Sequence, residues 1–295
     1  MKWMLIRLLV LAAILAPTGC GKAGPTSSEI DGAIKAKLGA AVVRGEKLLE
    51  AAPVSRFYKA RNGAHAWDDK DPEEILQAVR DIAQDGLNPR DYHLAAIERI
   101  LEQRKTETSA ALEGDLDILL TDATAAMIDH TRFGRVRPVT LDPTWNVDPR
   151  KGAPPLELAV QKIAEEGSPR QAIEERKPRH FIYVGLKRAL VELREAAAKG
   201  GWPTVPRGRV IKPGASDPRI PAIRARLAAT GELSGGGEGS TVYDPNLRRA
   251  VELFQTRHRQ DANGIIDKDV VDAMNVSAAA RANQVRVNLE RARWV

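Results

Sequence analysis

Between positions 217 and 275, apolar residues recur at helical spacing in three short segments, and turn-forming residues separate these segments. Asp244-Pro245 precedes the middle segment, and a carboxylate N-cap followed by proline favours a helix start at this point. The next apolar residues are Leu247, Ala250, Val251 and Phe254, and their i, i+3, i+4, i+7 spacing is that of a helix with one buried face. The pattern predicts three helices around one core, in a unit of about 60 residues, near the lower size at which a core supports itself.

A turn connects the second and third of these segments. Asn263-Gly264 is a dipeptide typical of tight turns, because glycine adopts positive φ without strain. The oxygens of Asp261, Asn263 and Asp267 also suggest a calcium loop, but an EF-hand loop places glycine at position six and glutamate at position twelve. Here Gly264 stands fourth and Asp272 twelfth, so the spacing favours a turn and no metal site is predicted.

The order of these fragments resembles the peptidoglycan-binding domain family of three-helix modules. The resemblance rests on the following fragments: Tyr243-Asp244-Pro245, Ala250-Val251, Phe254-Gln255, His258, Asn263-Gly264-Ile265-Ile266 and Met274-Asn275. It implies a peptidoglycan-binding domain over residues 213–276, although the family more often has aspartate where Asn263 stands. Tyr243, Gln255 and Asn263 are the candidate binding residues, since polar uncharged side chains suit a sugar ligand. The alternative is that these three residues stabilise a helix end and a turn.

Composition limits the classes of function. Hydrophobic residues make up 43% of the chain and charged residues 28%, as in folded soluble proteins. The net charge of +6 is mild for 295 residues, and the basic residues are spread along the chain. This charge suits an anionic wall or membrane surface and does not require a nucleic acid. Steeply salt-dependent DNA binding would favour the opposite conclusion.

Cysteine and histidine usage argues against metal and disulfide chemistry. Cys20 is the one cysteine, so the chain forms no disulfide within itself. The five histidines are far apart in the sequence and form no closely spaced ligand pair. No cofactor and no metal are predicted.

The N-terminus has the character of an export signal. Lys2 and Arg7 precede an apolar run from Leu8 to Ala16, which is short for a membrane span. The run leads to Cys20 in a context that resembles a bacterial lipoprotein cleavage site, although Pro17 departs from the residue usual at that position of the site. This predicts a signal peptide over 1–19, lipid attachment at Cys20 and a periplasmic, lipid-anchored location, at the outer membrane if the cell has one. The alternative is an ordinary signal with cleavage nearby.

A tether with a first helix is expected over 20–45, and a helical domain over 46–205. Helical periodicity is clear in Glu73–Gln84, Asp115–Arg132 and Pro178–Lys199, and glycines follow each of them. The fold class predicted is therefore mainly α, with a helical scaffold domain and a small three-helix module.

This helical region resembles the scaffold domain of large periplasmic L,D-transpeptidases. The matching fragments are Phe57-Tyr58, Ala66-Trp67, Asp85-Gly86-Leu87-Asn88-Pro89-Arg90-Asp91-Tyr92, Leu116-Asp117, Leu120-Thr121 and Gly134-Arg135-Val136. The tryptophans at 67, 145 and 202 are expected to hold irregular segments against the helices, with stacking on sugar rings as the alternative.

A last helix over 277–295 has an apolar seam, formed by Ala278, Ala282, Val285, Leu289 and Ala292. In the resembled enzymes this helix leads into a catalytic domain whose cysteine thiolate attacks a peptide carbonyl. Cys20 matches no such motif, so the chain is expected to be non-enzymatic, without catalytic residues.

Two hypotheses follow for the seam. If the chain is the front part of an L,D-transpeptidase, the seam is expected to be exposed or to face a catalytic domain. If it is a free-standing wall-binding lipoprotein that acts as an adaptor, a soluble monomer or a separate partner that covers the seam is expected.

Overall fold

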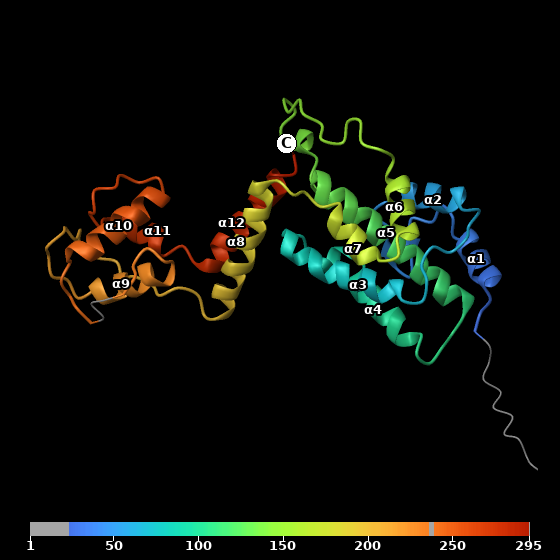
Figure 1. The fold of residues 1–295 in the computed structure, drawn as a ribbon, viewed down its shortest axis with the longest axis horizontal. Helices are drawn as coiled ribbons and strands as arrows, with labels where there is room; N and C mark the ends of the chain where they lie inside the picture. The colour runs from blue at the N-terminus through green and yellow to red at the C-terminus, as the bar shows by residue number, and fades with distance from the viewer. Residues whose placement is uncertain (1–23, 236–238, 295) are drawn as a thin grey trace, which may run out of the picture.

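The computed structural model describes residues 24–235 and 239–294, and it is mainly α-helical, as predicted. The helices form a large scaffold body, a two-helix stalk and a small module at the far end of the stalk (Figure 1). No helix within the described ranges combines the length and apolar character needed to cross a bilayer. Cys20 and the predicted signal peptide lie outside the described residues.

The scaffold body is built around α5 (Ala110–Phe133), which is buried along most of its length. Ser109 starts this helix by accepting a hydrogen bond from the Leu112 N–H at 3.3 Å, and Gly134 ends it. Other helices cover α5 on several sides, so its apolar residues are distributed around the helix and not along one face, as they would be in a surface helix. The helices around it are α1 Ser27–Lys35, α2 Ala51–Ala60, α3 Asp71–Asp81, α4 Leu94–Gln103, α6 Leu156–Glu165 and α7 Pro169–Glu175.

A two-stranded antiparallel hairpin, which the sequence analysis did not predict, precedes α2. Strands β1 (Val42–Val43) and β2 (Glu46–Lys47) pair through Val43 and Glu46. Arg44 and Gly45 both have positive φ, as a two-residue hairpin turn requires. Short 3₁₀ turns, Ile82–Asp85, Pro89–Tyr92 and Pro138–Thr140, complete the body.

A buried polar network joins α2 and α5 to the segment between α2 and α3. The Tyr58 hydroxyl lies 2.5 Å from the carboxylate of Asp117 and 2.7 Å from the Thr121 hydroxyl. The same carboxylate accepts the backbone N–H groups of Ala66 and Trp67, and the Trp67 indole N–H donates to Thr121 at 2.9 Å. Four sequence fragments that are separate along the chain therefore meet in one network.

The stalk consists of α8 (Phe181–Ala198) and α12 (Ala278–Arg291), which pack along each other (Figure 1). Their shared core buries Tyr183, Leu190, Ala282 and Leu289. The apolar seam of α12, expected to be exposed or to bind a catalytic domain or a partner, is therefore covered by α8 of the same chain. The expectation of an exposed seam was wrong, because the face of α8 that covers it was not assigned to it from the sequence. Binding of a catalytic domain or a partner to α12 stays a prediction.

The end of α12 is fixed to the scaffold body by buried polar contacts. Asp85, fully buried, lies 2.7 Å from the Lys177 ammonium, 2.9 Å from that of Lys187 and 2.9 Å from the Tyr183 hydroxyl. Arg293 donates to the Tyr183 hydroxyl at 3.2 Å and also to the backbone carbonyl of Asp85. The two cations hold the pKa of the Asp85 carboxyl below its usual value despite its burial.

The module contains α9 (Ile220–Ala229), α10 (Pro245–Arg257) and α11 (Lys268–Met274) around a core of its own. Asp244 accepts from the Leu247 N–H at 2.8 Å and Asp267 from the Val270 N–H at 3.0 Å, so both carboxylates are N-caps, as predicted for Asp244. The core residues are Val205, Ile211, Ile220, Ile223, Leu227, Leu233, Tyr243, Leu247, Ala250, Val251, Phe254, Ile266, Val270, Val271 and Met274.

The module lies between α8 and α12 in the sequence, while these two helices pack together. It is therefore an insertion at the tip of a helical stalk. At its base, Asn275 exchanges two 2.9 Å hydrogen bonds with the backbone of Val205, which brings the incoming and outgoing chain segments together.

Candidate functional site

The Asn263-Gly264 turn of the module is held by Gln255 on α10. Gly264 has φ +70°, which fits the predicted turn. The side-chain oxygen of Gln255 accepts from the Gly264 N–H at 2.9 Å, and its amide donates to the Ile265 carbonyl at 3.0 Å. Asn263 accepts from the Ile265 N–H at 2.8 Å and from the Gln255 amide at 3.2 Å.

Tyr243 contacts the same turn from the interior of the module. Its hydroxyl donates to the Gly264 carbonyl at 2.6 Å, and its burial raises the pKa of the phenol. The three candidate binding residues are thus brought together, but Tyr243 and Gln255 are buried and serve the turn. Asn263 is exposed. Ligand contact by these residues stays a prediction. Of the three side chains, only that of Asn263 is exposed to a ligand.

The tryptophans hold irregular segments against the helices. Trp67 is buried, and Trp145 packs edge-to-face against Trp294 with ring centroids 5.8 Å apart. Trp202 is half-buried, and the guanidinium of Arg226 lies 4.3 Å from its ring centroid. These contacts agree with the structural interpretation of all three side chains.

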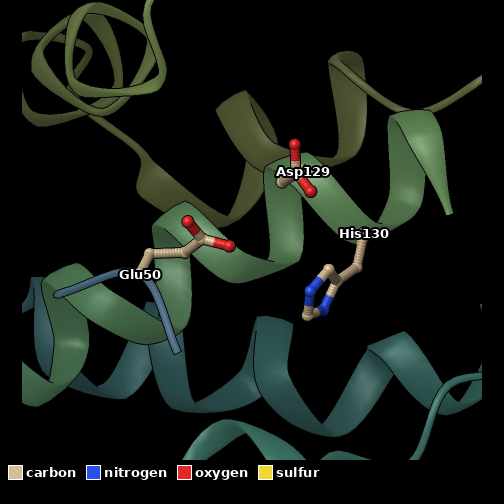
Figure 2. Close-up of side chains that lie close together, drawn as sticks. All are labelled: Glu50, Asp129 and His130. Atoms are coloured by element: carbon tan, nitrogen blue, oxygen red, sulfur yellow. The ribbon is translucent and has the colours of Figure 1, made fainter. Parts of the chain in front are cut away.

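Across residues 24–235 and 239–294, Glu50, Asp129 and His130 are the one group whose geometry suits a metal ion. Their ligand atoms lie within 4.8 Å of one another. Figure 2 shows Asp129 and His130 on α5 and Glu50 on the neighbouring segment that precedes α2. The Nδ1 of His130 lies 3.0 Å from the Tyr92 hydroxyl.

One of the two carboxylates in this group, that of Asp129, is already paired with a guanidinium. Arg150 contacts both oxygens of Asp129, at 2.6 and 3.2 Å, and donates to the Gly134 carbonyl at 2.7 Å. A divalent cation placed between the carboxylates would be repelled by this cation. Glu50, the other carboxylate, has no such ion pair among the described residues. Burial, together with the charges of Asp129 and Asp122, raises its pKa to about 7. The ion pair with Arg150 therefore explains the position of Asp129 better than a metal centre does.

A groove that the sequence analysis did not predict lies where the module meets the stalk. Its volume is about 270 Å³. The lining residues come from α8, the following linker, α9, α10 and α12, and they include Leu193, Trp202, Arg226, His258, Arg281 and Val285. No local sequence pattern signals this groove because its walls come from positions 193 to 288.

Comparison with protein families assigns two parts of the chain. Residues 52–190 match the scaffold domain family, and residues 216–274 match the peptidoglycan-binding domain family. No curated protein matches the chain. The chain therefore contains a scaffold domain and a peptidoglycan-binding domain, joined through the stalk.

Proposed function

We propose that this protein binds peptidoglycan in the cell envelope through the module at the tip of the stalk. The observation that carries the proposal is the family match over 216–274, together with the closed three-helix core of that region. The mild positive charge of the chain suits the carboxylates of a bacterial wall.

Co-sedimentation with purified, protein-free peptidoglycan tests this proposal. The intact protein is expected to pellet with the wall saturably and to remain in the supernatant without it. Failure to pellet at low salt, with the protein shown to be folded by circular dichroism, would contradict wall binding.

The scaffold body favours a role in wall cross-linking. We infer that this chain corresponds to the non-catalytic front of an L,D-transpeptidase, whose task is to place a catalytic domain on the wall. The support is the match of residues 52–190 together with the fragments that resemble those enzymes. The single cysteine, Cys20, precedes the scaffold and has no histidine nearby in the sequence, so this chain is proposed to be non-enzymatic.

A free-standing lipoprotein that acts as an adaptor on the wall is the second candidate. It is favoured by the position of Cys20 at the end of the apolar leader. The intact mass of the protein extracted from native membranes separates the two candidates. A mass for residues 20–295 plus a lipid supports the adaptor, and a much larger mass supports the transpeptidase.

The location is tested separately with Cys20→Ser. Lipid anchoring predicts that the native protein fractionates with the outer membrane and that the variant does not. Equal membrane association of the two proteins would contradict lipidation at Cys20.

A further inference from the structure

The groove between module and stalk lies next to a second hollow on the module surface. The second hollow has a volume of about 500 Å³ and is open to solvent on the side of α10 and α11. His258 and Arg281 line both hollows, so the two lie side by side, and together they are called the path below. The remaining residues of the second hollow are Arg257, Arg259, Asp272, Ala273 and Val276.

The charges along this path are unbalanced. Arg259 and Arg281 have no carboxylate within 4.0 Å in the part of the chain that the structure describes, and Arg281 donates to the amide oxygen of Gln284 at 3.0 Å. The two acids of the path are already paired. Glu232 lies 2.7 Å from Arg257, and Asp272 is contacted by Arg207 and Lys268.

A buried guanidinium gives the inner wall of the path a fixed shape. Arg226 is 1% exposed, and it donates to the Met274 carbonyl at 2.7 Å and to the Thr230 hydroxyl at 2.8 Å. Its guanidinium lies against the ring of Trp202. Because these contacts hold both side chains, the inner wall presents a positive charge and an aromatic face in a fixed orientation.

His258 adds an acceptor between the two hollows. Its ring stacks on Phe254 with centroids 3.9 Å apart, and its Nδ1 lies 2.8 Å from the Phe254 carbonyl. A carbonyl only accepts, so Nδ1 carries the proton. Burial lowers the pKa of His258 below its usual value. The ring is therefore neutral at pH 7, and Nε2 remains as a hydrogen-bond acceptor.

Among the described residues, the guanidinium groups of Arg259 and Arg281 have no carboxylate within 4.0 Å. Together with an acceptor and an aromatic face, they match a short peptide that carries carboxylates. We propose that this groove binds the carboxylate-bearing peptide of peptidoglycan, and this proposal rests on the proposed wall-binding function. Arg259 and Arg281 pair with peptide carboxylates, because a guanidinium donates two parallel N–H groups to the two oxygens of a carboxylate. The Nε2 of His258 accepts a peptide N–H, and Trp202 supports the peptide from the side.

The location of the groove has a consequence for the whole molecule. One wall belongs to the module, through Arg226 and His258, and the other belongs to the stalk, through Leu193 and Arg281. A ligand in the groove contacts both parts, so it stabilises the orientation of the module on the stalk. Binding is therefore expected to raise the melting temperature of the intact protein.

Calorimetric titration of the intact protein tests this proposal with a soluble disaccharide–tetrapeptide fragment of peptidoglycan. The same fragment with its carboxyl groups amidated is the matched ligand control. We expect the amidated fragment to bind at least tenfold more weakly. We expect a similar loss for the double variant R259Q/R281Q, measured with the unmodified fragment. Arg249→Gln, an exposed arginine on α10 outside both hollows, is expected to bind as the wild type does.

Equal affinity for the amidated and unmodified fragments would overturn the proposal, and this comparison does not depend on the folding of any variant. Absence of fragment binding would also overturn it, provided that the protein still pellets with whole peptidoglycan. If the wild type does not pellet with whole peptidoglycan, the proposed function itself fails. The three outcomes are therefore distinguishable.

Discussion

The carboxylate of Glu290 on α12 accepts a hydrogen bond from the backbone N–H of Val136 at 2.8 Å, which fixes the last helix to a loop of the scaffold body. The two residues are 154 positions apart, and the whole module lies between them. The family match over 52–190 ends within α8, yet the body of the scaffold includes contacts from α12. The module is thus carried on a stalk whose second helix returns to the scaffold.

Gly134→Ala is expected to weaken this return contact. Gly134 has φ +84°, and a Cβ there would lie 2.7 Å from the Glu290 carboxylate and 2.7 Å from the Trp294 indole nitrogen. Gly152→Ala is the matched control, because Gly152 has φ +80° and no atom within 4 Å of the added Cβ. The control is expected to cost about 1–2 kcal/mol from backbone strain alone.

Gly134→Ala is expected to cost more than the control, with faster amide exchange over α12. Denaturant unfolding and hydrogen exchange measure both effects. Equal losses for the two variants would show that the contact with Glu290 and Trp294 does not limit stability.

Leu289→Ala tests the packing of α12 on α8. Leu289 is fully buried, so its truncation is expected to destabilise the protein by about 2–5 kcal/mol. Val287→Ala, on the same helix but 55% exposed, is expected to change the unfolding free energy by less than about 0.5 kcal/mol. Urea unfolding curves measure both. Similar small changes for both variants would mean that the α12 seam is not covered in solution.

Gln255→Ala tests whether this candidate binding residue supports the turn or contacts the ligand. Loss of its hydrogen bonds leaves the buried Gly264 N–H without a partner, and we expect a destabilisation of about 2–3 kcal/mol. Well below the melting temperature, wall binding is expected to remain at the wild-type level. Thr256→Ala, exposed on the same helix, controls for the truncation itself. A folded Gln255→Ala variant that no longer pellets with peptidoglycan would favour direct contact.

Glu50 gives the scaffold a pH-dependent term in its stability. Its folded-state pKa of about 7 lies above the ordinary value of 4.5, so the folded state retains a proton that the unfolded chain releases. This contribution is fully present below pH 4.5 and is lost as the pH rises through 7. We therefore expect Glu50→Gln to melt at a higher temperature than the wild type at pH 8 and at about the same temperature at pH 4.5.

Glu107→Gln, which removes an exposed carboxylate, is the control for the change in net charge. Scanning calorimetry across pH 4.5–8 measures the difference. A constant offset between Glu50→Gln and the wild type at every pH would contradict a raised pKa at Glu50.

Local sequence signals predicted the helices and caps of the module well. Asp244 and Asp267 cap the expected helices, because an N-cap depends on residues within one turn. The face of α8 was predicted less well. The apolar spacing predicted a helix over Pro178–Lys199, but the apolar Ile182 is 51% exposed, whereas Tyr183 is fully buried and its hydroxyl pairs with the distant Asp85. The apolar periodicity of a helix does not reveal a polar partner that is distant in the sequence.

The candidate site shows the same limit. Tyr243, Gln255 and Asn263 meet at one turn, which agrees with the alternative that they stabilise a helix end and a turn, while their contact with a ligand stays a prediction. The burial of Tyr243 and Gln255 was not predictable, because it depends on how α9 and α11 pack around α10. Arg281 joins Arg226 in the groove and Arg259 in the second hollow only because α12 returns to the stalk.

The most direct test removes the module and leaves the rest of the chain. Residues 200–276 are replaced by a short Gly/Ser linker that joins α8 to α12, and the variant is compared with the intact protein in co-sedimentation with purified peptidoglycan. The variant is expected to stay helical, to melt cooperatively and to remain in the supernatant. Pelleting equal to that of the intact protein would contradict wall binding by the module, and an unfolded variant would contradict its independence from the scaffold.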